Sequence, residues 1–312
     1  MGLKSFEWTF TKRPLRRYEP PKHSQDTPIE RRPSASTVLV DAFDLLNNQR
    51  GVGWSWSQNP FPRESTPPPS TTLLLAKTLL KLTMFDASQY IIQRVCPSVS
   101  NPRGGSIFDP SLALAPRTAL AAFCSICGGV WAYTMLDSGH YVSALVGRII
   151  FRQPASLSPP LFHRPWMSTS LHDFWSFRWH QLLRPIFIFF GARPGGALLG
   201  KPGAVMGAFG VSAIVHHIGM WGMGNGTDFV AVGGFFLLMG VGAVMEAAFT
   251  RATGLRVRGW IGWSWTMTWT LLWGMFIIDG WARHGMLANE FVPNGFRPGK
   301  KVVDAIIALS SR

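Results

Sequence analysis

Residues 229–249 read FVAVGGFFLLMGVGAVMEAAF, and this stretch decides the class of fold. It is apolar throughout except for Glu246 near its end. A helix rises about 1.5 Å per residue, so a run of this length reaches about 30 Å, the thickness of the hydrocarbon core of a bilayer. The run therefore predicts a membrane-spanning helix.

Other apolar runs repeat this pattern. Three are long enough to span: residues 118–136, 203–223 and 260–278. Tryptophans near run ends are typical of the aromatic belt at a membrane interface. For three shorter or amphipathic stretches the sequence does not decide whether they span the membrane. Residues 71–95 could lie in the interface or in a bundle, and residues 141–150 can span only as a continuation of the preceding helix. Residues 182–192 are too few to span and are expected to be re-entrant or extended. We expect an all-α, polytopic membrane protein with about four spans and two or three uncertain ones.

The composition agrees with this class. Hydrophobic residues make up 47% and charged residues 15%, against about 25% charged in soluble domains. The net charge of +14 suits nucleic acid, anionic lipid or a phosphate-bearing ligand. Nucleic acid is disfavoured because the aromatic residues lie in apolar runs rather than between basic residues. Membrane lipids and a phosphate-bearing co-substrate remain as expected partners.

The N-terminal part differs from the rest. Residues 1–70 are polar, basic and rich in Pro. We expect an arm that is partly structured on the membrane surface, with a plain linker as the alternative. The expected organisation is this arm, a membrane core at 71–290 and a tail at 291–312.

Residues 170–181, SLHDFWSFRWHQ, place ionisable side chains among large aromatic ones. Ser168, Thr169 or Ser170 can cap a helix that Pro185 ends or kinks. At 3.6 residues per turn, one face of that helix would carry Asp173, Phe177, His180 and Arg184. The stripe fits either a helix in the headgroup region or the wall of a polar cavity.

Residues 209–224, FGVSAIVHHIGMWGMG, hold two histidines in an apolar run. An ionisable group inside the membrane is costly and is therefore a functional hypothesis. Side chains of His216 and His217 point about 100° apart, so we expect one to face a cavity and the other to pack. A neutral histidine in a dry pocket suits general-base work. Purely structural histidines are the alternative.

A metal centre is not expected. Neither a carboxylate nor a thiol lies at ligand spacing from the histidine pair. Cys124 and Cys127 have metal-ligand spacing within CSIC, but they lie in an apolar run without a matching second pair, and we expect small buried residues there.

Three motifs together resemble a known family. SLHDFWSFRWHQ resembles the SLxDFWxxRWH/N signature of the wax-synthase-like branch of membrane-bound O-acyltransferases. FGVSAIVHH is similar to that branch's FxxSxxxH segment, and RGVGW at 50–54 is similar to an RGxGW motif of its fungal members. His217 departs from the Glu that often follows the histidine in the plant members.

The resemblance implies transfer of an acyl group from acyl-CoA, most simply acetyl-CoA, to the hydroxyl of a lipophilic alcohol. No bound cofactor is implied. His216 would be the general base, and His180 would orient the acceptor or stabilise developing charge. Asp173, Trp175, Arg178 and His217 would support the site. Fungal members of the branch often acetylate terpenoid or meroterpenoid alcohols. The alternatives are a wax ester synthase and a non-enzymatic membrane scaffold or transporter. We expect an integral membrane protein of the endoplasmic reticulum.

Overall fold

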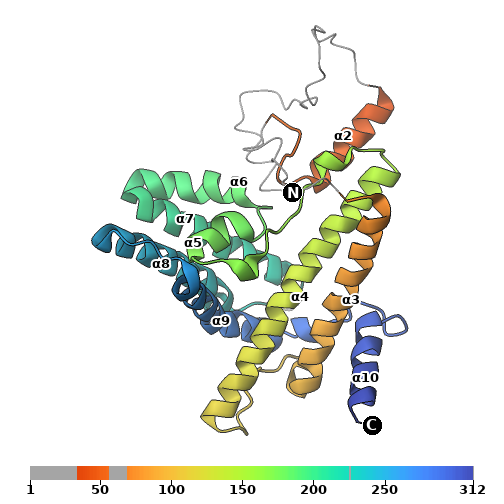
Figure 1. The fold of residues 1–312 in the computed structure, drawn as a ribbon, viewed down its shortest axis with the longest axis vertical. Coiled ribbons are helices and arrows are strands. Elements are labelled where there is room, and N and C mark those ends of the chain that lie inside the picture. The colour runs from red at the N-terminus through yellow and green to blue at the C-terminus, as the bar shows by residue number, and fades with distance from the viewer. Residues whose placement is uncertain (1–33, 56–68, 225, 312) are drawn as a thin grey trace.

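The computed structural model describes residues 34–55, 69–224 and 226–311. Within these ranges the chain forms helices and no β-strand (Figure 1), which confirms the predicted class. The long helices are α2 (Ala35–Asn47), α3 (Thr71–Val95), α4 (Leu114–Ile149), α7 (Arg193–Gly222), α8 (Phe229–Thr253), α9 (Gly259–Arg283) and α10 (Pro298–Ser310). Most of the polar arm, residues 1–33 and 56–68, lies outside the described residues.

The helices α3 and α4 form a long pair (Figure 1). The apolar residues 141–150 do continue the preceding helix, because α4 runs without a break to Ile149. Between the two helices, Lys81 Nζ lies 3.1 Å from Asp137 Oδ2 and donates to the Tyr133 hydroxyl at 2.7 Å. The charged side chain of Lys81 therefore has its partners on α4, and α3 belongs to the bundle.

On another side of α3 lies α10. Arg297 Nε, just before α10, donates to Asp86 Oδ1 at 2.8 Å, and the Tyr90 hydroxyl donates to Asp304 at 2.7 Å. Gly299 lies so close to the backbone of Thr83 and Ala87 that a Cβ there would clash. These contacts attach the C-terminal residues to the core, although the division at 71–290 and 291–312 stays a prediction.

Residues 184–222 fold into a helical hairpin. The first arm comprises α6 (Arg184–Phe187), the π-helix η5 (Ile188–Ala192) and the start of α7. The chain reverses at Leu199 and Gly200, where φ and ψ are non-helical and Gly200 has φ of 65°. The expectation of an extended segment at 182–192 is therefore wrong for residues 184–192, which are helical because helix satisfies the backbone groups of so apolar a segment internally.

Glycines let the two arms of the hairpin approach. A Cβ at Gly203 would clash with the carbonyl oxygen of Gly195, and one at Gly207 with that of Gly191. Close backbone approach through small residues is the usual way in which helices associate in membranes. The two arms of the hairpin thus pack directly against each other through these glycines.

We expect Gly203→Ala to lower the stability of the protein by about 1–3 kcal/mol, because the added methyl group forces the arms apart. Gly210→Ala is the matched control: it lies in the same helix, and a Cβ there meets no neighbouring atom within 4 Å. The measurement is the thermal unfolding midpoint in detergent. Equal midpoints for both variants would contradict a tightly closed hairpin.

Among the described residues, three helical segments are long and apolar enough to cross a membrane: Leu114–Ile149, Arg184–Gly222 and Phe229–Thr253. They contain the predicted runs 118–136 and 229–249, and all but the last residue of the run 203–223. The run at 260–278 forms α9, which is not among these three segments, so its crossing of the membrane stays a prediction.

Candidate active site

A cavity of about 930 Å³ lies between α4, α7, α8, α9 and residues 165–183. We call it the chamber. Most of its wall is apolar and aromatic, including Trp131, Trp175, Trp179, Phe235, Phe236 and Ile278. Few polar side chains interrupt this wall, among them Gln49, Lys81, Tyr133, His180, His216 and Thr270. An apolar cavity with a few polar groups is the usual form of a small-molecule site.

His216 reaches the chamber from α7. Its Nδ1 lies 2.8 Å from the backbone carbonyl oxygen of Ser212, one helical turn earlier. A carbonyl oxygen only accepts, so Nδ1 carries the hydrogen and Nε2 keeps its lone pair. The imidazole stacks on Phe236 with ring centroids 4.1 Å apart, which fixes its orientation. The geometry leaves Nε2 as the basic atom.

Ser212 lies one helical turn before this histidine, and its geometry does not favour a role as nucleophile. Its Oγ lies 3.4 Å from His216 Nδ1. Because Nδ1 donates its hydrogen to the carbonyl oxygen, it has no lone pair with which to activate the hydroxyl. His216 is therefore arranged to act on a group in the chamber.

His180 also lies on the chamber wall, but it does not lie on a helix. Residues 171–178 form one helical turn (α5, Leu171–Asp173) and a π-helix (η4, Phe174–Arg178), and Trp179 is extended with ψ of 160°. The predicted helical face through Asp173 and His180 is therefore wrong. Pro185 lies in the first turn of α6 instead of ending the preceding helix, because its ring fits a first turn.

The N-cap prediction for this segment is confirmed for Ser170, whose Oγ accepts from the backbone N–H of Asp173. The side chain of His180 reaches the chamber because the π-helix and the extended Trp179 turn the chain. π-Helical turns are often found at functional sites.

Burial, and to a smaller extent the nearby His216, lower the pKa of His180 to about 3. Its Nδ1 is buried and has no hydrogen-bond partner among the described residues. His180 lies between the membrane-spanning segments and is neutral throughout the physiological range. The chamber wall thus presents two imidazoles close enough to interact electrostatically.

We expect acidification to destabilise the protein through His180. Below pH 6.5 the unfolded chain binds a proton at this position that the folded chain does not, so stability falls as the pH drops from about 6.5 toward 3. The slope from one such group is at most about 1.4 kcal/mol per pH unit. His180→Asn should flatten unfolding midpoints between pH 7 and 5, whereas the exposed His172→Asn should not. An unchanged slope in His180→Asn would contradict burial of the neutral ring.

Asp173 and Arg178 form an ion pair, with Arg178 Nε 2.5 Å from Asp173 Oδ2. Arg178 Nη1 also donates to the carbonyl oxygen of His163 at 3.3 Å, and His163 N–H donates back to the Arg178 carbonyl oxygen at 2.9 Å. These bonds hold the π-helix against the loop before it. The pair supports the segment that carries Trp175, whose side chain lines the chamber.

His217 does not line the chamber. Its ring meets Phe229 edge to face, with centroids 5.2 Å apart. Of the two adjacent histidines, the structure therefore places His216 at the chamber and His217 in the packing between α7 and α8.

Glu246 was not assigned a role from the sequence, yet it organises the segment. It is buried in α8 and accepts from the backbone N–H groups of Leu171 at 2.6 Å and His172 at 3.1 Å. Its Oε1 also accepts from Trp265 Nε1 at 2.8 Å. Glu246 thus caps the helical turn that leads to Asp173 and Trp175 and ties it to α8 and α9. Its isolation in an apolar run was the available signal.

Comparison with known proteins relates the segment that carries the two chamber histidines to a family. Residues 158–238 match the membrane bound O-acyl transferase family. That stretch of the chain is similar to the proteins of this family. The match covers both histidines of the chamber, and the resemblance named from the sequence motifs is confirmed. The similarity to this membrane-bound family and the three long apolar helices together indicate that the protein is an integral membrane protein.

Relatives of two kinds are found. O-Mevalon transferase macI of Penicillium terrestre is 26% identical over 79% of this chain and 63% of its own length. O-Mevalon transferase yanI of Aspergillus niger is 24% identical over 46% of this chain and 34% of its own length. Long-chain-alcohol O-fatty-acyltransferase of Simmondsia chinensis is 30% identical over 32% of this chain and 30% of its own. The chain thus spans less than two thirds of each of these relatives.

Proposed function

We propose that the protein transfers an acyl group from acyl-CoA to the hydroxyl of a lipophilic alcohol, with acetyl the first candidate group. The observation that carries this proposal is the pair of imidazoles on the wall of an apolar chamber, with Nε2 of His216 left basic. The wall suits a lipophilic acceptor, and Ser212, whose hydroxyl lies beside His216, is not activated by that histidine to form an acyl-enzyme.

In the proposed reaction, Nε2 of His216 takes the proton of the alcohol as its oxygen attacks the thioester carbon. Charge develops on the carbonyl oxygen, and the neutral His180 donates a hydrogen bond to it. The C–S bond then breaks, and the protonated His216 returns the proton to the leaving sulfur. The products are the ester and free CoA, and His216 is restored.

The acceptor we propose is a fungal secondary metabolite, such as a terpenoid or meroterpenoid alcohol. The relative that aligns with 79% of the chain is fungal and named an O-Mevalon transferase, whereas the plant long-chain-alcohol enzyme aligns with 32%. A wax ester synthase is the second candidate, favoured by that plant relative and by the apolar chamber. A scaffold or transporter would leave the histidine geometry unexplained. We place the enzyme in the endoplasmic reticulum.

The test is an ester-forming assay with microsomes that contain the protein. Acetyl-CoA and palmitoyl-CoA are each supplied with a terpenoid alcohol and with a long-chain primary alcohol. Acetyl ester of the terpenoid supports the first candidate, and palmitoyl ester of the long-chain alcohol supports wax synthesis. The absence of any ester above the level of empty microsomes would overturn the proposed function.

A further inference from the structure

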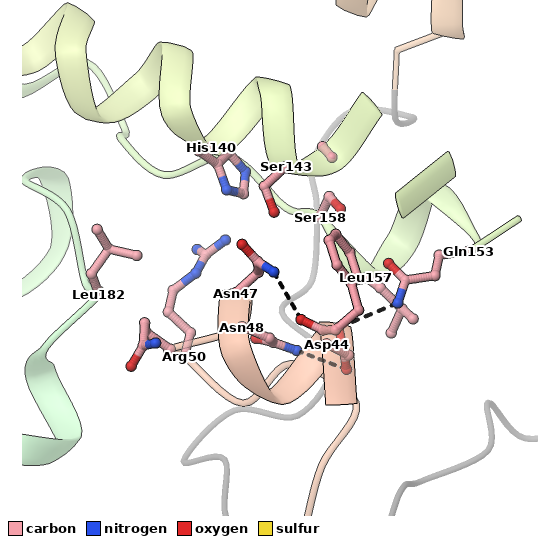
Figure 2. A pocket seen from close by; sticks show the side chains of 13 residues that line it. Asp44, Asn47, Asn48, Arg50, His140, Ser143, Gln153, Leu157, Ser158 and Leu182 are labelled. Atoms are coloured by element: carbon pink, nitrogen blue, oxygen red, sulfur yellow. Dashed lines mark hydrogen bonds between the residues drawn. The ribbon is translucent and has the colours of Figure 1, made fainter. Parts of the chain in front are cut away.

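A second, smaller pocket lies beside the chamber (Figure 2). Its volume is about 40 Å³, and it lies between the end of α2, the turn at 48–50, residues 140–144 of α4 and the loop at 153–158. We call it the niche. In contrast to the chamber, nine of its thirteen lining residues are polar or charged. A pocket of this size admits a small polar group or a few waters.

The charged residues of the niche are already used in the structure. Arg50 donates to the carbonyl oxygens of Pro159, at 2.5 Å, and Pro160, at 2.9 Å. The carboxylate of Asp44 accepts from Trp54 Nε1 at 2.5 Å. With one guanidinium, of Arg50, and one carboxylate, of Asp44, among its lining residues, the niche has no excess positive charge. It is therefore suited to a neutral, hydrogen-bonding group rather than to a phosphate.

One buried polar atom of the niche lacks a partner. Nε2 of His140 is buried and has no hydrogen-bond partner among the described residues. Ser143 lies nearly one turn further along α4 and also lines the niche (Figure 2). Buried polar atoms in native proteins are nearly always hydrogen-bonded, so an unpartnered one in a pocket indicates a missing ligand or water.

The niche and the chamber share part of their walls. Gln49 and Leu182 line both pockets. Leu182 follows His180 by two residues in the same non-helical segment. A flexible group held in the niche therefore lies next to the end of the chamber at which the histidines stand.

We propose that the niche binds one amide group of the pantetheine arm of the thioester donor, while the arm continues along the wall shared with the chamber and the thioester itself enters the chamber. This inference rests on the proposed function, because it presumes an acyl-CoA donor. The arm is neutral and carries amides and a hydroxyl, which match His140, Ser143 and the other polar groups of the niche. The turn of the RGVGW motif thus serves donor binding, because it supplies Arg50 and lies directly after Gln49.

The experiment measures binding without turnover. Purified protein in detergent is titrated with CoA, with pantetheine and with 3′,5′-ADP. Ser143→Leu fills the niche and His140→Phe removes its unpartnered nitrogen. The matched control is Val142→Leu, an exposed position on the same turn of α4. We expect the Kd for CoA and for pantetheine to rise at least about tenfold in both niche variants, with the Kd for 3′,5′-ADP unchanged.

The outcomes separate this inference from the proposed function. Unchanged CoA affinity in His140→Phe, or a loss confined to 3′,5′-ADP, overturns the niche assignment even if the wild type forms ester. CoA binding that depends on the niche, without ester formation by any alcohol, supports the niche while the proposed function fails. If Ser143→Leu does not fold, the binding result for His140→Phe alone tests the niche assignment, because phenylalanine keeps a planar aromatic side chain there.

Discussion

His216→Ala is expected to lower kcat for ester formation by about 10²–10⁴-fold, the usual contribution of a positioned general base. The physical reason is that the bond from Nδ1 to the Ser212 carbonyl oxygen leaves Nε2 as the only basic atom of this ring. The KM for acyl-CoA should change little, because the imidazole acts on the attacking hydroxyl. The measurement is steady-state kinetics with the substrate pair that the ester assay identifies.

Two matched variants accompany this measurement. Ser212→Ala removes the hydroxyl but keeps the backbone carbonyl oxygen, so its kcat should stay within a few-fold of wild type. His217→Ala alters packing against Phe229 and should affect stability more than kcat. If Ser212→Ala abolishes turnover, Ser212 forms an acyl-enzyme and direct transfer is wrong. If His216→Ala retains wild-type kcat, His216 is not the base.

Glu246→Ala is expected to produce the largest loss of stability. The change leaves two backbone N–H groups and one indole N–H without their acceptor in a buried site. Each of the three orphaned donors costs about 1–3 kcal/mol, so the sum of about 3–9 kcal/mol is comparable with the whole net stability of many domains. The variant should unfold at a much lower temperature or fail to accumulate.

The control for this prediction is Met245→Ala, an exposed neighbour on the same helix. Glu246→Gln keeps one acceptor oxygen and should recover part of the stability. Thermal unfolding in detergent and the yield of folded protein are the readouts. An unfolding midpoint for Glu246→Ala equal to that of Met245→Ala would show that the cap contributes little.

Several features of the site were predictable from local pattern. His216 stood in an apolar run, where a titratable side chain is too costly to be incidental. An N-cap among Ser168, Thr169 and Ser170 was predictable from residue type and position, and the structure selects Ser170. Such signals depend on a residue and its near neighbours in sequence, and tertiary packing did not reverse them.

Other features depended on contacts between distant residues. The helix expected at 170–181 ends at Arg178, because the chain becomes π-helical at Phe174–Arg178 and extended at Trp179. Periodicity assumes an uninterrupted α-helix and could not anticipate that turn. The role of Glu246 was equally hidden, since its partners lie 74 and 75 residues earlier in the chain.

By itself the sequence determined the helical class, the apolar segments of membrane length and the two stretches that hold the site, because these follow from hydrophobicity and residue type along the chain. Only the tertiary structure decided that His216 rather than His217 faces the chamber, that residues 184–222 fold back on themselves, and that His180 joins His216 at one wall. These are consequences of side-chain packing between helices, where the close approach of glycines and the buried carboxylate of Glu246 select one arrangement among those that the pattern allows.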